Sequence, residues 1–230
     1  MKKPETQKYR AALCAAFLLA APLCAQVAKQ ANSQYQTAEG RQQVAATLSA
    51  PDRDERQRPQ ELIKGMGLTR GMAVADVGTG IGYMLPSLSR RVGPMGRVFA
   101  EDIFDDYLAA ARQTAEAQHL NNIVFIKGAE NDPKLPENAL DRVLVLDAYH
   151  HFDYPKAMLA GIYKALKPAG RLVIVDYYKS EAAMPNGRAL THIRLDKPDV
   201  IKEVEANQFH LVSEGEQIPN VQYMLVLEKN

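Results

Sequence analysis

The sequence predicts an α/β fold in which a mostly parallel sheet of seven strands lies between helices. Short apolar runs alternate with longer segments of helical periodicity along most of the chain, as in domains built from successive strand–helix units. The runs are apolar at consecutive positions, which is typical of strands buried on both faces. The length of 230 residues and a hydrophobic share of 47% are enough for one domain with a sizeable core.

A helix and a turn are expected before the first strand. Pro59 suits the first turn of a helix, and Leu62, Ile63 and Met66 recur after it at helical spacing. Residues 69–71 end in glycine and predict a turn into the strand.

Strands and helices then alternate. Apolar runs predict strands at 72–77, 97–102, 122–127, 142–147 and 171–177. Helical periodicity predicts helices at 81–92, 104–119 and 155–166. Gly- and Pro-rich turns are expected at 93–96 and 167–170. This alternation favours a parallel sheet covered by helices.

The last fifty residues follow another pattern. We expect a loop or lid at 179–196, a helix at 198–207, and strands at 209–214 and 221–228. Since only a short connection separates these two strands, they should pair antiparallel.

The N-terminus resembles a secretory signal peptide. Four basic residues within 1–10 precede an apolar stretch at 11–25 that is shorter than a membrane span. Cleavage after Ala25 would release a periplasmic protein with no stable membrane insertion. The alternatives are an uncleaved, membrane-tethered anchor and a cytoplasmic extension. We therefore divide the chain into a signal peptide at 1–25, an N-terminal arm at 26–55 with a short helix at 38–48, and a domain at 56–230.

Composition excludes several functional classes. A net charge of +1 without basic runs gives no basis for nucleic-acid binding. Both cysteines, Cys14 and Cys24, lie in the signal peptide, so the mature chain would have neither a catalytic thiol nor a Cys-based metal site. His150 and His151 are adjacent, and adjacent residues seldom chelate one ion, so we expect no metal.

A glycine-rich turn is the strongest functional signal. The predicted first strand ends in Asp76, and Gly78, Gly80 and Gly82 follow at alternate positions. Such a strand, turn and helix start present bare backbone N–H groups to a ligand. The spacing does not fit the dinucleotide fingerprint G-x-G-x-x-G. The second strand ends in acid, at residues 101–102, and a carboxylate about 20 residues beyond such a turn commonly binds ribose hydroxyls. An adenosine-containing cofactor is therefore expected.

The acid-first pattern Asp-x-Gly-x-Gly-x-Gly resembles the first motif of class I S-adenosylmethionine-dependent methyltransferases, and the resemblance extends over 57–229. Residues 96–103 resemble the second strand with its ribose acid, which the alignment places at Asp102 and not at Glu101. Residues 128–136 resemble the loop that contacts adenine, 141–152 the fourth strand with its following loop, and 166–172 the turn before the fifth strand, with Ala169 where glycine is usual.

The resemblance implies a Rossmann-like methyltransferase fold whose antiparallel last strand inserts between the fifth and sixth. It implies S-adenosyl-L-methionine as cofactor, with Asp102 on the ribose, residues 129–130 at the adenine, and two strand-end acids near the methionyl ammonium. The cofactor-binding positions are then Asp76, Gly78, Thr79, Gly80, Gly82, Asp102, Ile103, Ala129, Glu130 and Asp147.

The expected activity is in-line displacement of the methyl group onto a small-molecule acceptor. In the family the loop at His150 and His151 borders the acceptor, so either ring is a candidate general base; packing of the loop is the alternative role. Acceptor choice would lie in the arm and in 179–196, which carry no motif for it. The alternative function is an exported, non-catalytic ligand-binding protein on the same fold.

Overall fold

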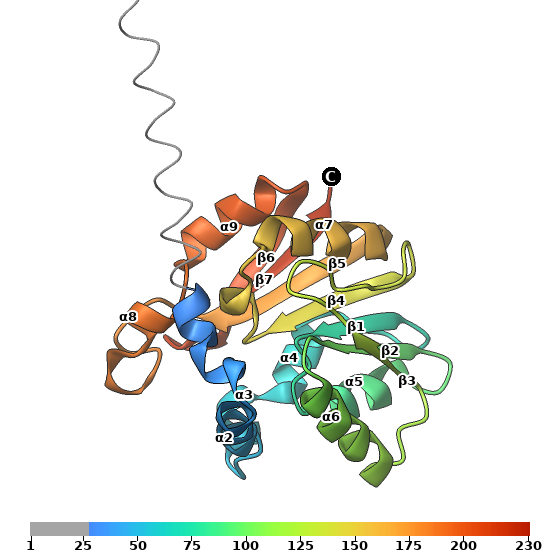
Figure 1. Ribbon diagram of the computed structural model, residues 1–230. Coiled ribbons are helices and arrows are strands. Elements are labelled where there is room, and N and C mark those ends of the chain that lie inside the picture. Colours follow the sequence, from blue (N-terminus) through green and yellow to red (C-terminus); the bar gives the residue numbers. More distant parts are fainter. Residues whose placement is uncertain (1–27) are drawn as a thin grey trace, which may run out of the picture.

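The computed structural model describes residues 28–230, so the predicted signal peptide lies outside the described residues. One seven-stranded sheet has the order β3-β2-β1-β4-β5-β7-β6 (Figure 1). β7 runs antiparallel to both of its neighbours, and the other pairs are parallel. The predicted fold class is confirmed, including the insertion of the last strand between the fifth and the sixth. The strands are β1 (Ala73–Val77), β2 (Arg97–Asp102), β3 (Ile123–Lys127), β4 (Leu140–Leu146), β5 (Leu166–Tyr177), β6 (Phe209–Ile218) and β7 (Gln222–Lys229).

Helices cover both faces of this sheet (Figure 1). The α-helices are α2 (Ala38–Leu48), α3 (Arg53–Gln57), α4 (Pro59–Gly65), α5 (Leu85–Val92), α6 (Asp105–Ala117), α7 (Pro155–Ala165), α8 (Ala189–His192) and α9 (Lys197–Glu205). Short 3-10 helices are η1 (Asn32–Gln36), η2 (Tyr149–His151) and η3 (Pro185–Gly187).

The core has two halves, one on each face of the sheet. Successive strand residues alternate between them: Val74 and Leu144 pack with α4, α5 and α6, whereas Ala75 and Val143 pack with α7 and α9. All four side chains are fully buried. This alternation is the physical reason for the uninterrupted apolar runs, since both sides of each central strand need apolar residues.

Three predicted boundaries are wrong. The helix expected from residue 81 begins at Leu85, because Gly82 has a φ of +83°, outside the helical region. The fifth strand begins early, since Leu166 pairs with Leu140 and Arg171 with Arg142, leaving 167–170 as a bulge. The sixth strand extends to residue 218.

The N-terminal arm is fastened across the carboxyl edge of the sheet. The helix expected at 38–48 is confirmed as α2. Side-chain contacts hold the described part of the arm in place: Arg41 forms an ion pair of 2.7 Å with Asp106 of α6, and its carbonyl accepts from the Tyr107 hydroxyl at 3.1 Å. Arg188 donates to Gln34 of η1 at 3.3 Å, which joins the arm to the segment 179–196. Figure 1 shows η1 beside that segment.

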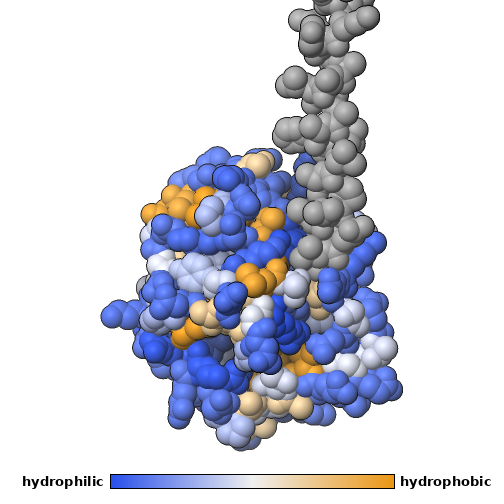
Figure 2. Space-filling model, turned by 90° about the vertical axis from the view of Figure 1, so that its left-hand side faces the viewer, coloured by the Kyte–Doolittle hydropathy of each residue, from blue (hydrophilic) through white to orange (hydrophobic). Residues whose placement is uncertain are grey.

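The described surface gives no sign of a membrane-spanning helix: between residues 28 and 230 no helix has the length and apolar character to cross a bilayer. In Figure 2 the visible face is mostly hydrophilic, and its apolar residues form small separate patches. Scattered apolar residues of this kind are normal for a protein surface.

Candidate functional site

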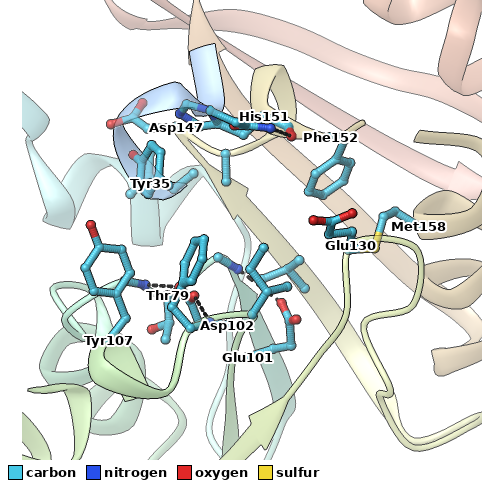
Figure 3. Close-up of a pocket in the computed structure, with 18 of the residues that line it drawn as sticks. Tyr35, Thr79, Glu101, Asp102, Tyr107, Glu130, Asp147, His151, Phe152 and Met158 are labelled. Atoms are coloured by element: carbon cyan, nitrogen blue, oxygen red, sulfur yellow. Dashed lines mark hydrogen bonds between the residues drawn. The ribbon is translucent and has the colours of Figure 1, made fainter. Parts of the chain in front are cut away.

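A cavity opens where the parallel strands end. Its walls are the residues that follow β1, β2, β3 and β4 together with side chains of the N-terminal arm, and it encloses about 1120 Å³ of empty space, its open mouth included. Open α/β sheets bind ligands outside the carboxyl ends of their strands. Figure 3 shows Glu101 and Asp102 at one end of this cavity, with Asp147 and His151 at the other.

The glycine turn forms the floor beside β1. Its glycines have positive φ values of +74°, +54° and +83° at residues 78, 80 and 82, which only glycine adopts without strain. The expected bare N–H groups are not free in this structure. Gly78 and Thr79 donate to the Glu101 carbonyl at 3.0 and 2.8 Å, and Gly80 donates to Asp102 Oδ2 at 2.9 Å. The turn therefore uses its N–H groups to hold the end of β2.

The three glycines differ in what surrounds them. A Cβ on Gly80 would meet only Leu48 of the arm, at 3.4 Å, so this glycine keeps the cavity floor open. A Cβ on Gly82 would lie 3.0 Å from the Cα of Ala111, so that glycine lets the turn pack on α6. Gly78, Thr79 and Gly80 line the cavity, whereas Gly82 and Asp76 lie outside its wall.

Asp76 stabilises the turn from the side that faces away from the cavity. Its Oδ2 accepts a hydrogen bond from the Thr79 hydroxyl at 2.8 Å, and the side chain is 2% exposed. Burial raises its pKa to about 6. Through Thr79 this carboxyl fixes a side chain that does reach the cavity.

Asp102 is the acid that the sequence assigned to the ribose, and it lines the cavity with Ile103. The Phe104 N–H donates to Oδ1 and the Gly80 N–H to Oδ2, both at 2.9 Å. Burial raises its pKa to about 6, and the two backbone hydrogen bonds oppose that rise. Each oxygen keeps a further lone pair that can accept a ligand hydroxyl.

Glu101 is a second carboxyl on the same wall, with no role assigned from the sequence. Its Oε2 accepts from the Gly78 N–H at 3.2 Å, whereas Oε1 is buried without a partner among the described residues. Burial, followed by the charge of Asp102, raises the pKa of Glu101 well above its ordinary value. Gly128 makes room for it, since a Cβ there would lie 1.7 Å from Oε1.

The loop after β3 closes the side of the cavity. Ala129 and Glu130 both line it, as the sequence expected of an adenine-contacting loop. Ala129 and Asp132 exchange backbone hydrogen bonds of 2.8 and 3.2 Å, which fixes the turn. In Figure 3 Glu130 lies beside Phe152 and Met158, so this side combines a carboxylate with apolar surface.

Asp147 follows β4 in a left-handed conformation, with φ of +52°. Non-glycine residues seldom adopt it, and they concentrate at functional sites when they do. Gln222 of β7 donates to Oδ1 at 2.6 Å, and burial, then the charge of Asp176, raises the pKa of Asp147 to about 7. The carboxyl lines the cavity.

The two histidines nominated as bases have different positions. His151 lines the cavity, whereas the buried His150 lies outside its wall and bonds through Nδ1 to Asp176 Oδ1 at 2.7 Å. Asn32 Oδ1 lies 2.6 Å from His151 Nδ1. Burial, then the neighbouring His150 and His192, lowers the pKa of His151 well below its ordinary value. At neutral pH this ring is therefore uncharged.

The arm contributes side chains that the sequence did not reveal. Tyr35 stacks on Phe104 with ring centroids 5.9 Å apart and planes at 11°, and burial raises its pKa to about 12. Arg53 lies over the Tyr83 ring at 3.9 Å and also lines the cavity. Both belong to a segment rich in Gln and Ala, where no motif marks either residue.

The cavity is a strongly acidic environment. Asp76, Glu101 and Asp102 are buried at or just behind its wall, and Asp147 is half-buried there. All four have raised pKa values, and Arg53 is a basic residue among those that line the cavity. Carboxyls that are costly to ionise when the cavity is empty become favourable partners for a positively charged ligand. A ligand with a cationic centre and a diol therefore fits the residues present.

Comparisons with known proteins agree with this geometry. The family model described as a methyltransferase domain matches residues 68–225. A solved S-adenosylmethionine-dependent methyltransferase from Aquifex aeolicus is similar at 27% identity and a TM-score of 0.74, over 80% of this chain and 96% of that one.

The matches to curated relatives cover a smaller part of this chain. The ubiquinone/menaquinone biosynthesis C-methyltransferase UbiE of a Marinomonas strain is 28% identical over 123 residues, which are 53% of this chain and 49% of that protein. The same enzyme from Pseudomonas putida is 30% identical over 114 residues, or 49% of this chain and 44% of that protein. The chain thus spans about half the length of the curated relatives it matches.

Proposed function

Because the chain belongs to the methyltransferase domain family and is a class I S-adenosylmethionine-dependent methyltransferase, we propose that it methylates a small, mostly apolar acceptor with a ring. The observation that carries this proposal is the part that the arm takes in the cavity wall. Asn32, Tyr35 and Gln36 of the arm line the cavity together with the strand ends, which supports an acceptor small enough to fit between them.

The remaining lining supports a flat acceptor. Tyr35, Tyr107 and Phe152 contribute aromatic surface around the cavity, and ring stacking against such side chains favours an aromatic partner. The curated relatives are C-methyltransferases of ubiquinone and menaquinone biosynthesis, which also supports an acceptor built on a ring. We therefore infer a phenol- or quinol-like acceptor.

We propose the following placement of the cofactor. Asp102 accepts the ribose hydroxyls, and Ile103 with residues 129–130 contacts the adenine. The turn at 78–80 contacts the methionyl part, with Gly82 and Asp76 supporting the turn from behind. Asp147 faces the ammonium, and Arg53 pairs with the methionyl carboxylate, a charge-assisted contact that the N–H groups of the turn do not supply. This assignment rests on which residues line the cavity and on their charges.

The cofactor supplies an electrophilic methyl group on a sulfonium. When bound, it would give this methyl group to an electron pair of the acceptor, the electrons of the carbon–sulfur bond would stay on sulfur, and S-adenosylhomocysteine would be released. The protein aligns acceptor, methyl and sulfur and keeps water out. His151 is placed to take a proton from an acceptor hydroxyl, and His150, bonded to Asp176, positions the loop.

The test combines binding with turnover. Calorimetry should detect S-adenosylmethionine and S-adenosylhomocysteine binding. Mass spectrometry should detect a methylated product from a panel of simple phenols and quinols, with aliphatic amines of similar size as controls. Binding without turnover of any member of the panel would favour the non-catalytic alternative. Turnover of the amines alone would contradict the acceptor class.

We also propose that the protein is exported after removal of residues 1–25, leaving the arm at 26–55 and the domain at 56–230. The basic head and short apolar stretch of the sequence support this proposal. The mass of the intact protein from a periplasmic fraction should correspond to a chain that begins at Gln26. A full-length chain in the cytoplasm would contradict it.

A further inference from the structure

Three histidines from two distant segments meet beside the cavity, and one of them, His151, lines its wall. His150 and His151 belong to η2, and His192 ends α8. The centroid of the His150 ring lies 4.0 Å from that of His151 and 5.0 Å from that of His192, and the last two rings are 5.3 Å apart. One ligand nitrogen from each ring lies within 4.8 Å of one from each of the others.

The hydrogen bonds of Asp176 determine which nitrogen of His150 is free. Oδ1 lies 2.7 Å from His150 Nδ1 and accepts from the Tyr177 N–H at 2.8 Å, and Oδ2 accepts from the His150 N–H at 3.0 Å. This buried carboxylate acts as an acceptor on both oxygens, so His150 Nδ1 carries the proton. Nε2 keeps its lone pair.

The hydrogen bonds of Asn32 determine which nitrogen of His151 is free. Its Nδ2 donates to the His151 carbonyl at 2.9 Å and to Asp153 Oδ2 at 3.1 Å, which fixes the amide orientation. Oδ1, 2.6 Å from His151 Nδ1, is therefore the acceptor. His151 Nδ1 carries the proton, and its Nε2 also keeps a lone pair.

His192 completes the set from the other side. Its ring is half-buried and has no hydrogen-bond partner among the residues that the structure describes. The basic side chain of Arg188, one helical turn before His192, donates a hydrogen bond to Gln34 and not to the His192 ring. Neither ring nitrogen of His192 is therefore committed within the described chain.

We propose that His150, His151 and His192 bind one divalent transition-metal ion of the Zn²⁺ type. Metal-binding histidines characteristically hold their second nitrogen to a carboxylate or carbonyl oxygen, as Asp176 and Asn32 do here. Three imidazoles with a fourth position left open form a common catalytic zinc set. Nitrogen ligands select this ion over Mg²⁺ and Ca²⁺, which prefer oxygen.

The geometry requires only a small closure. Two nitrogens on one tetrahedral zinc ion, at about 2.0–2.1 Å from the metal, lie about 3.3 Å apart. The ligand nitrogens that lie within 4.8 Å of one another, one on each ring, would thus draw together by about 1.5 Å at most. The adjacency of His150 and His151 argued against a metal as long as they stood alone, and the third ligand from 179–196 removes that objection.

The metal site extends the proposed function. Its existence does not depend on that function, and only its use in catalysis rests on it. An ion on His151 occupies the nitrogen that would otherwise act as a base. In the metal-loaded protein the ion would supply Lewis-acid chemistry beside the cavity, next to His151, and it would tie α8 to the loop after β4. The metal site itself can be tested without any methyl acceptor.

The experiment uses the full-length, untagged chain with Cys14→Ser and Cys24→Ser, so that no thiolate can hold the ion. After chelation and dialysis, Zn²⁺ binding is followed by calorimetry and Co²⁺ binding by visible absorption. We expect one ion per chain, a tetrahedral Co²⁺ spectrum and no heat from Mg²⁺. No Zn²⁺ binding, or several equivalent ions per chain, would overturn the proposal.

Two variants and a matched control locate the site. His192→Ala should weaken Zn²⁺ binding by about 100-fold or more, and Asn32→Ala by about 10- to 100-fold. His210→Ala, at an exposed histidine in β6, should leave it unchanged. Wild-type Zn²⁺ affinity in His192→Ala would contradict the assignment. S-adenosylhomocysteine binding in His192→Ala reports folding and the cofactor site separately, so failure of either proposal can be distinguished.

Discussion

At the scale of single residues, the site depends on carboxyls that are held in place before a ligand binds. Asp102 receives one backbone N–H on each oxygen, so its orientation costs no further ordering when a ligand binds. Glu101, its neighbour, receives one N–H and leaves its other oxygen without a described partner. Adjacent acids on one strand end thus have different environments, and we expect different roles.

The Asp102 assignment predicts a loss of affinity. Asp102→Ala should weaken S-adenosylmethionine binding by about 1–3 kcal/mol, the range for losing hydrogen bonds to a charged group. Calorimetry measures this affinity, and Asp105→Ala, at an exposed residue, is the control. Equal affinity in wild type and Asp102→Ala would refute the ribose role.

Burial of Glu101 predicts a pH-dependent stability. Its folded-state pKa lies well above the ordinary 4.5, so the folded protein binds this proton more tightly than the unfolded chain. The free energy of unfolding contributed by Glu101 therefore falls as the pH rises from about 4.5 towards the folded-state pKa. Glu101→Gln cannot ionise, so the variant does not lose this free energy of unfolding as the pH rises. Urea unfolding at pH 5, 7 and 8.5 should show the variant gaining on the wild type as the pH rises, and a constant difference would contradict the prediction.

At the scale of elements, the arm supplies part of the cavity wall, and the segment 179–196 supplies the third ligand of the proposed metal site. η1 supplies Asn32 and Tyr35, α3 supplies Arg53, and α8 supplies His192. These elements are short, and side-chain contacts with α6 and η2 hold the arm in place. Their contribution follows from where they dock and not from their own sequence pattern.

Arg53 tests the contribution of the arm. Arg53→Ala should weaken S-adenosylmethionine binding by about 1.5–3 kcal/mol, because a charged partner of the methionyl carboxylate is lost. Arg56→Ala, on the same helix but exposed and paired with Asp52, is the matched control. Calorimetry on both variants measures the affinity for S-adenosylmethionine. A similar loss in the two would point to α3 as a whole and not to the guanidinium.

At the scale of the whole molecule, the sheet gathers acids from three strand ends into one low-dielectric cavity. Asp76 and Asp102 have pKa values near 6 and Asp147 near 7 in the free protein. A cationic ligand favours their ionised forms, so binding should lower these pKa values and release protons.

This charge balance predicts that S-adenosylmethionine binds more tightly as the pH rises from 5 to 7.5. Protons held by the three acids compete with the ligand at the lower pH, and the competition ends once the acids ionise. Calorimetry in buffers of different ionisation enthalpy measures both the affinity and the protons released. S-adenosylhomocysteine, which lacks the sulfonium charge, should show a smaller rise. Equal pH dependence for the two ligands would contradict the role of the acids.

The sequence by itself determined the sheet and the floor of the site. Alternating apolar runs and helical segments specified the strands, because central strands must be apolar on both faces. The glycine turn and Asp102 were predictable because their chemistry is local: three glycines take positive φ values, and an acid ends the next strand. The start of α5 was missed because Gly82 delays the helix although its apolar periodicity begins earlier.

Only the tertiary structure decided what closes the cavity and what meets there. It showed that the N–H groups of the turn hold β2, that Tyr35 and Arg53 reach the cavity from the arm, and that His192 joins His150. These contacts join residues that lie from 22 to more than 100 positions apart in the chain. Local periodicity contains no information about such contacts, because they depend on how separate elements dock on one edge of the sheet.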